Sequence, residues 1–154
     1  MKVLSRADLE AIGARVIRAY AALPGIAGQA IERVDIDYLC HSLLGLRIDY
    51  AQGRLTAGLG RFLASGPSVS HGGQARVLLE VFSEEGETEC GEDQFYMLDG
   101  KTLLIESELI RDGANIGRRN YTVSHESCHH ILKLLYPQDY GAQTMERGVH
   151  YCYR

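Results

Sequence analysis

The chain has 154 residues, 45% of them hydrophobic, and a formal net charge of −4 at pH 7. This length and composition suit one soluble domain with a buried core. Lys and Arg together number 16 against 20 for Asp and Glu. The sequence therefore carries no overall positive charge that would attract nucleic acid or an anionic membrane, and we expect neither as a partner.

Nothing in the sequence resembles a targeting or membrane segment. Charged residues are scattered through the first 20 positions, and no apolar run approaches the length of a membrane span. The four cysteines lie far apart without a pattern, which favours reduced thiols over a disulfide framework. We therefore expect a cytoplasmic protein.

The first part of the chain predicts two helices and a strand. Ser5 is the expected N-cap of a helix from about Arg6 to Ala22, because apolar residues recur there at helical spacing. A second helix is predicted over 31–44 on the same grounds. Residues 46–50, LRIDY, are typical of a short strand that follows it.

The middle of the chain is less regular. Residues 53–73 are rich in glycine, and within them LTAGLGRFL (55–63) is interpreted as a broken strand. Residues 75–83 favour a strand because they are rich in Val, Leu and Phe. The acidic segment 84–93 is interpreted as a solvated loop, since its spacing does not match a calcium-binding loop.

A hairpin is predicted at about 94–106. Asp99-Gly100 lies between two apolar runs and supplies the positive φ angles that a tight turn needs. Residues 110–119 are predicted to be a loop that leads into a helix. The order of elements predicts a single α+β domain over residues 1–154, with N-terminal helices, a small sheet with a hairpin, and a last helix packed on that sheet.

The last helix carries the motif H-E-x-x-H. Residues 118–137 read RRNYTVSHESCHHILKLLYP, and Pro137 is expected to end the helix. His125 and His129 lie one turn apart on the same face, so both imidazoles can bind one ion. Glu126 lies about 100° around the helix, within reach of a water held by that ion. This is the arrangement of a hydrolytic zinc site, in which the carboxylate is the general base.

The alternative is an ordinary amphipathic helix with a few partly exposed polar residues. Two histidines and a glutamate are costly inside an otherwise apolar helix, and a metal-binding cleft explains them. His130 points about 100° away from His129, so we expect it beside the site or at the surface. Cys128 is expected to pack against the sheet. Neither is predicted to be a ligand.

The run GRRNYTVSHESCHHIL, preceded by YMLDGKTLLIESEL and by two N-terminal helices, resembles the ImmA/IrrE family of metallo-endopeptidases. In that family a basic residue, an aromatic residue and a threonine lead into the motif, matched here by Arg119, Tyr121 and Thr122. The resemblance is sharpest over about 94–137.

This resemblance implies a minimal zincin-like metallopeptidase in the cytosol. His125 and His129 would bind Zn²⁺, and Glu126 would be the catalytic base. The implied substrate is a protein, a helix-turn-helix repressor of a mobile element or stress regulon, whose cleavage relieves transcriptional silencing. Two histidines also suit manganese, cobalt or nickel, so zinc is preferred through the motif and its chemistry.

The third metal ligand is not identified. Similar proteins supply an acidic residue from a later helix, and no such pattern follows Pro137. A fragment that lacks the acid-bearing segment is the favoured explanation. The alternative ligands are Asp139, Glu146, His150 and Cys152, of which His150 ranks first because imidazole binds zinc well. Without a third ligand, a non-catalytic module that binds or senses a regulator is the alternative function.

Overall fold

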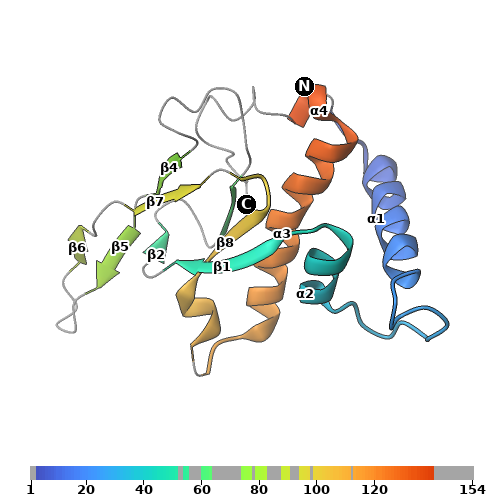
Figure 1. The fold of residues 1–154 in the computed structure, drawn as a ribbon, viewed down its shortest axis with the longest axis horizontal. Coiled ribbons are helices and arrows are strands. Elements are labelled where there is room, and N and C mark those ends of the chain that lie inside the picture. The colour runs from blue at the N-terminus through green and yellow to red at the C-terminus, as the bar shows by residue number, and fades with distance from the viewer. Residues whose placement is uncertain are drawn as a thin grey trace. The chain divides into compact units, whose positions relative to one another are not determined.

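A computed structural model describes most of the chain. The residues outside the description are 1–2, 52–53, 56–59, 64–73, 78, 83–87, 91–93, 98, 112 and 141–154. Contacts divide the chain into two compact units, Met1–Leu46 and Arg47–Arg154. The elements combine helices with small sheets, which confirms the α+β class (Figure 1). A single domain over the whole length stays a prediction.

Helix α1 (Arg6–Ala21) of the first unit agrees closely with the prediction. The Ser5 side chain accepts a hydrogen bond from the Asp8 backbone N–H, and the Asp8 carboxylate accepts one from the Ser5 N–H. This reciprocal capping box satisfies two of the N–H groups that a helix start leaves unpaired. The predicted N-cap is therefore confirmed.

The second helix begins later than predicted. Asp35 caps it by accepting hydrogen bonds from the backbone N–H groups of Asp37 and Tyr38, at 3.0 and 3.1 Å. The helical segment therefore consists of α2 (Ile36–Tyr38) and the π-helical turn η1 (Leu39–Leu43). The prediction of a helix from residue 31 was wrong, because the Asp35 side chain fixes the start five residues further on.

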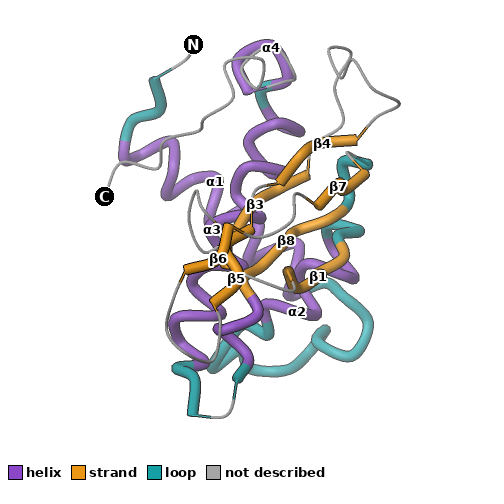
Figure 2. The backbone as a smooth tube through the Cα atoms, turned by 90° about the vertical axis from the view of Figure 1, so that its left-hand side faces the viewer, coloured by secondary structure: helices purple, strands orange, loops and turns teal. Residues whose placement is uncertain are grey.

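The second unit is built around a sheet of three strands. Strand β8 (Thr102–Glu106) lies between β1 (Arg47–Ala51), which is parallel to it, and β3 (Gly60–Leu63), which is antiparallel (Figure 2). All five residues of β8 are buried, with Leu103, Leu104 and Ile105 at 0% exposure. Strand β1 confirms the predicted strand at 46–50 to within a residue.

The predicted hairpin at 94–106 was wrong. The turn itself forms, since Gly100 has φ 69° and the Asp99 carboxylate accepts a hydrogen bond from the Lys101 N–H at 2.8 Å. Strand β7 (Gln94–Met97) does not return along β8, however, but pairs with β4 (Gln74–Val77). Both edges of β8 are occupied by β1 and β3, which leaves no edge for β7.

The middle of the chain forms several short strands. The predicted strand at 75–83 is divided between β4 and β5 (Leu79–Phe82), which belong to different sheets. Strand β5 pairs with β2 (Arg54–Leu55) and β6 (Thr88–Cys90), so part of the predicted acidic loop is a strand. The broken strand predicted at 55–63 overlaps the last residue of β2 and the whole of β3. The remainder of the glycine-rich and acidic segments lies outside the described residues.

Helix α3 (Ile116–Leu135) is the longest element of the second unit and crosses the three-stranded sheet (Figure 1). It contacts β8 and β3, so the motif helix lies against this sheet, while the zincin-like arrangement stays a prediction. The turn η2 (Ser107–Ile110) connects β8 to the loop before α3. The short helix α4 (Pro137–Tyr140) follows α3. No helix in the described part of the chain has the length and apolar character needed to cross a membrane.

Candidate metal centre

Local capping determines where α3 begins and ends. The Asn115 side chain accepts hydrogen bonds from the N–H groups of Gly117 and Arg118, at 2.9 and 3.3 Å. The predicted loop at 110–119 is therefore four residues too long, because Asn115 starts the helix. The helix ends at Leu135, directly before Tyr136 and Pro137, as the proline predicted. The motif consequently lies in the middle of the helix, away from its frayed ends.

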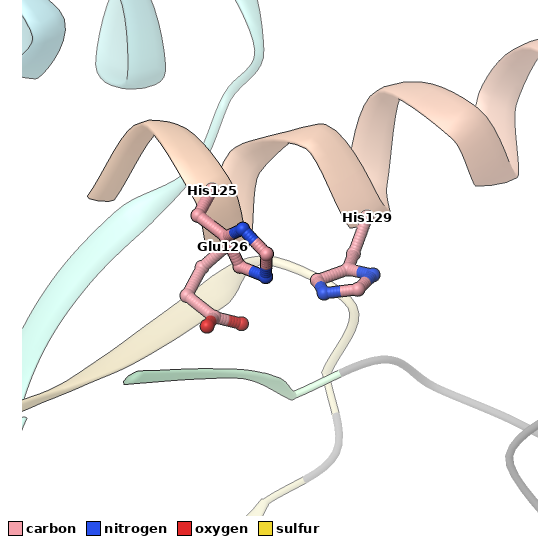
Figure 3. Close-up of side chains that lie close together, drawn as sticks. All are labelled: His125, Glu126 and His129. Atoms are coloured by element: carbon pink, nitrogen blue, oxygen red, sulfur yellow. The ribbon is translucent and has the colours of Figure 1, made fainter. Parts of the chain in front are cut away.

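The structure brings together the three predicted site residues. One donor atom from each of His125, Glu126 and His129 lies within 4.8 Å of the others. The two imidazole rings have centroids 5.3 Å apart and planes at 79°. All three side chains project from the same side of α3 (Figure 3). Spacing by four residues places the histidines one above the other, as helical geometry requires.

This donor set can hold a metal ion. Zinc binds imidazole nitrogen at about 2.0 to 2.1 Å in tetrahedral geometry, so two donors of one ion lie about 3.4 Å apart. The donor atoms here lie within 4.8 Å of one another, so the side chains would have to rotate toward the ion to bind it. Two imidazoles and a carboxylate are ligands that zinc and its neighbours in the first transition row accept.

Glu126 is buried, with 8% of its surface exposed, whereas His125 and His129 are half-buried. It belongs to the face of α3 that is turned inward, whose buried members are Arg119, Thr122, Val123, Glu126 and Ser127. That face is mostly polar. Because Glu126 is more buried than the two histidines, the carboxylate of the donor group lies on the inner side and the imidazoles lie nearer the solvent.

Local hydrogen bonds satisfy the small polar groups on this face. The Thr122 hydroxyl donates to the Arg118 carbonyl at 3.0 Å, and the Ser127 hydroxyl donates to the Ser124 carbonyl at 2.8 Å. Such bonds to the preceding turn are common for Ser and Thr within helices. They allow hydroxyls to be buried without the cost of an unsatisfied polar group.

Arg119 connects the same face to the sheet. Its Nε and Nη2 atoms donate to the Tyr50 hydroxyl, at 3.1 and 2.7 Å, although only 6% of the arginine is exposed. Its Nη1 donates to the Asn120 side chain at 3.2 Å. Tyr50 lies on β1 opposite Ile105 of β8, so this contact fixes the first turns of α3 to the parallel strand pair. The role of Tyr50 was not predicted, because no local pattern connects it with a residue 69 positions away.

The prediction that Cys128 packs against the sheet was wrong, because the residue is exposed. It follows Glu126 by two positions and so lies about 200° from the buried face. Even so, desolvation by the surrounding protein raises the pKa of the Cys128 thiol, and the charge of Glu126 raises it further. A thiol that stays protonated is a poor ligand and nucleophile. His130 is half-buried and is not part of the donor group.

Among the described residues, the donor group consists of His125, Glu126 and His129 only. Asp139 lies on α4 and is not part of it. Glu146, His150 and Cys152, the other predicted substitutes for a third ligand, lie outside the described residues.

Comparisons with protein-family models, with curated proteins and with solved structures found no match for this chain. The function proposed below therefore rests on the residues and geometry of the site, together with the motif resemblance.

Proposed function

We propose that this protein is a zinc-dependent endopeptidase that resembles ImmA/IrrE proteins and cleaves a helix-turn-helix transcriptional repressor. The observation that carries the proposal is the convergence of His125, Glu126 and His129 on one side of a helix that packs on a sheet. The substrate class comes from the motif resemblance alone. The same resemblance suggests the minimal zincin-like fold.

Each of the three residues has a role in this proposal. The imidazoles of His125 and His129 would bind the ion. When bound, zinc supplies a Lewis acid that polarises a carbonyl and lowers the pKa of a water molecule. The Glu126 carboxylate would accept a proton from the attacking water and would then deliver it to the leaving nitrogen. Its burial supports this role, because charge interactions strengthen where water is excluded.

Proteolysis is tested with the zinc-loaded full chain and a library of peptides prepared from a cell proteome. New peptide ends are detected by mass spectrometry. We expect cleavage by the wild type, none after chelation, and at least about a hundredfold less by Glu126→Gln, the size of effect typical of losing a general base. The matched control is Glu108→Gln, which removes a carboxylate from η2. A Glu126→Gln protein that cleaves as fast as the wild type would eliminate the proposal.

One observation favours a non-catalytic alternative. The donor group offers two histidines, with Glu126 needed either as the base or as a third ligand, whereas catalytic zinc sites commonly have three protein ligands. In the alternative, the protein binds or senses a regulator without cutting it. A stable complex with a repressor that stays intact after long incubation with zinc would favour this alternative.

A further inference from the structure

Tyr121 lies one turn before His125 on α3 and is 72% exposed. The centroids of the Tyr121 and His125 rings are 6.3 Å apart, with the planes inclined by 34°. His125 is in turn 5.3 Å from His129. Spacing by four residues therefore places three rings in a row along one side of the helix. The tyrosine stands at the end of this row nearest the start of the helix.

Tyr121 borders the donor group on its solvent side. Exposure falls from Tyr121, through the half-buried histidines, to the buried Glu126. The other exposed large apolar residues of α3 are Ile116 and Leu134. Each is five positions from the nearest ring of the row and so lies about 140° around the helix from it. Among these three residues, Tyr121 alone shares a side with the imidazoles.

We propose that the ring of Tyr121 forms a specificity wall, which takes an apolar or aromatic side chain of the substrate next to the bond that is cut. This inference rests on the proposed function and narrows its substrate class. An exposed aromatic ring offers area for burial and a face or edge for a second ring. The positive charge of a bound divalent ion close by disfavours a cationic side chain there.

Small hydroxamic acids test the proposal without a known substrate, because the hydroxamate binds zinc while its arm lies beside the metal. The probes are acetohydroxamic acid, with no arm, 3-phenylpropionohydroxamic acid, with an aromatic arm, and 6-aminohexanohydroxamic acid, with a cationic arm. Their dissociation constants are measured by calorimetry on the zinc-loaded full chain. The variants are Tyr121→Ala and Tyr121→Phe, with Leu134→Ala as the matched control at an exposed position elsewhere on α3.

In the wild type we expect the aromatic arm to strengthen binding about tenfold over acetohydroxamic acid, from buried area and ring contact together. The cationic arm should give no gain. Tyr121→Ala should reduce the tenfold gain to less than about twofold, while Tyr121→Phe and Leu134→Ala keep it, because the ring and not the hydroxyl makes the contact. Acetohydroxamic acid should bind all variants equally, which also checks that each one folds and holds zinc.

If the aromatic arm strengthens binding to Tyr121→Ala as much as to the wild type, the proposed role of Tyr121 is wrong, while the proposed metal centre is unaffected. A gain from the cationic arm that depends on Tyr121 overturns the assigned substrate class. If acetohydroxamic acid itself does not bind the zinc-loaded wild type, the proposed metal centre fails, and the inference fails with it. The probe without an arm thus distinguishes failure of the inference from failure of the metal centre on which the proposed function depends, and the cleavage assay with Glu126→Gln tests that function separately.

Discussion

Replacing Tyr50 with Phe removes one oxygen atom from the contact between α3 and β1. In the wild type this hydroxyl accepts two hydrogen bonds from the Arg119 guanidinium, at 3.1 and 2.7 Å. The arginine is 6% exposed, so the donors that lose their acceptor cannot be fully solvated in its place. Hydrogen bonds to charged groups contribute about 1.5 to 3 kcal/mol each, and two bonds to one oxygen are not additive. We expect the variant to lose about 2 to 3 kcal/mol of unfolding free energy.

Urea unfolding followed by far-ultraviolet circular dichroism measures this loss. With a typical slope of about 1 to 3 kcal/mol per molar urea, a loss of about 2 to 3 kcal/mol should lower the midpoint by roughly 0.7 to 3 M. Tyr38→Phe is the matched control, because its hydroxyl donates to a neutral backbone carbonyl, that of Pro24. The control should cost about 1 kcal/mol, as a neutral hydrogen bond does.

A double-mutant cycle tests whether Arg119 is the group through which the Tyr50 hydroxyl stabilises the protein. In an Arg119→Met background no guanidinium needs the hydroxyl, so Tyr50→Phe should cost less than about 1 kcal/mol there. The reasoning is refuted if Tyr50→Phe costs the same in both backgrounds, since the hydroxyl would then act through another group. It is also refuted if the single substitution costs less than about 0.5 kcal/mol.

Three further predictions concern the site and the turn before β8. His129→Ala should lower zinc affinity by at least about a hundredfold, because it removes a ligand. Glu126→Gln should retain near-stoichiometric zinc in metal analysis. If both variants lose zinc to the same degree, Glu126 is a ligand. In metal-free protein, Cys128 should react with iodoacetamide more slowly than a free thiol at pH 8, because desolvation by the surrounding protein and the Glu126 charge raise the pKa of its thiol. Glu126→Gln should accelerate the reaction, which peptide mass spectrometry can measure; an unchanged rate contradicts this. Burial raises the pKa of Asp99, but the hydrogen bonds from Lys101 and Thr102 and the charge of Arg47 outweigh it, so the pKa is lowered overall. A lowered pKa contributes stability above the unfolded value of 3.8 that is lost as the pH falls through the folded value. Asp99→Asn should therefore be less stable than wild type at pH 7, and the difference should disappear in urea titrations at acid pH.

Features that depend on neighbouring residues could be predicted from the sequence. Helix α1 starts where Ser5 can cap it, and α3 ends where Pro137 follows. The common side of His125 and His129 follows from helical periodicity alone, which is why the structure brings the predicted site residues together.

Features that depend on distant residues could not be predicted. Asp99 and Gly100 form the expected turn, but a turn does not decide which strand takes each edge of β8. The parallel partner of β8 begins at Arg47, which donates hydrogen bonds both to the Lys101 carbonyl and to the Asp99 carboxylate. That pairing connects segments about 50 residues apart, and strand pairing of this kind leaves no local pattern.

The buried face of α3 was the least predictable feature. Cys128 was expected to pack against the sheet, yet Cys128 and Tyr121 are exposed and a mostly polar face is buried instead. Hydrophobic patterning predicts the inner face of a helix only where apolar side chains fill that face. Here the hydroxyls of Thr122 and Ser127 donate hydrogen bonds to backbone carbonyls of the preceding turn, and the Arg119 guanidinium donates to the Tyr50 hydroxyl, so these polar groups can be buried.

A metal ion at the donor group would place positive charge beside the buried Glu126 carboxylate. A buried carboxylate is costly unless positive charge or hydrogen bonds lie near it, and the donor atoms of His125 and His129 lie within 4.8 Å of that of Glu126. A divalent ion held there would compensate the carboxylate and would make use of both histidines at once. The buried polar face of α3 thus includes the glutamate of the motif beside Arg119, Thr122 and Ser127, and natural sequences often depart from local patterning where a site requires it.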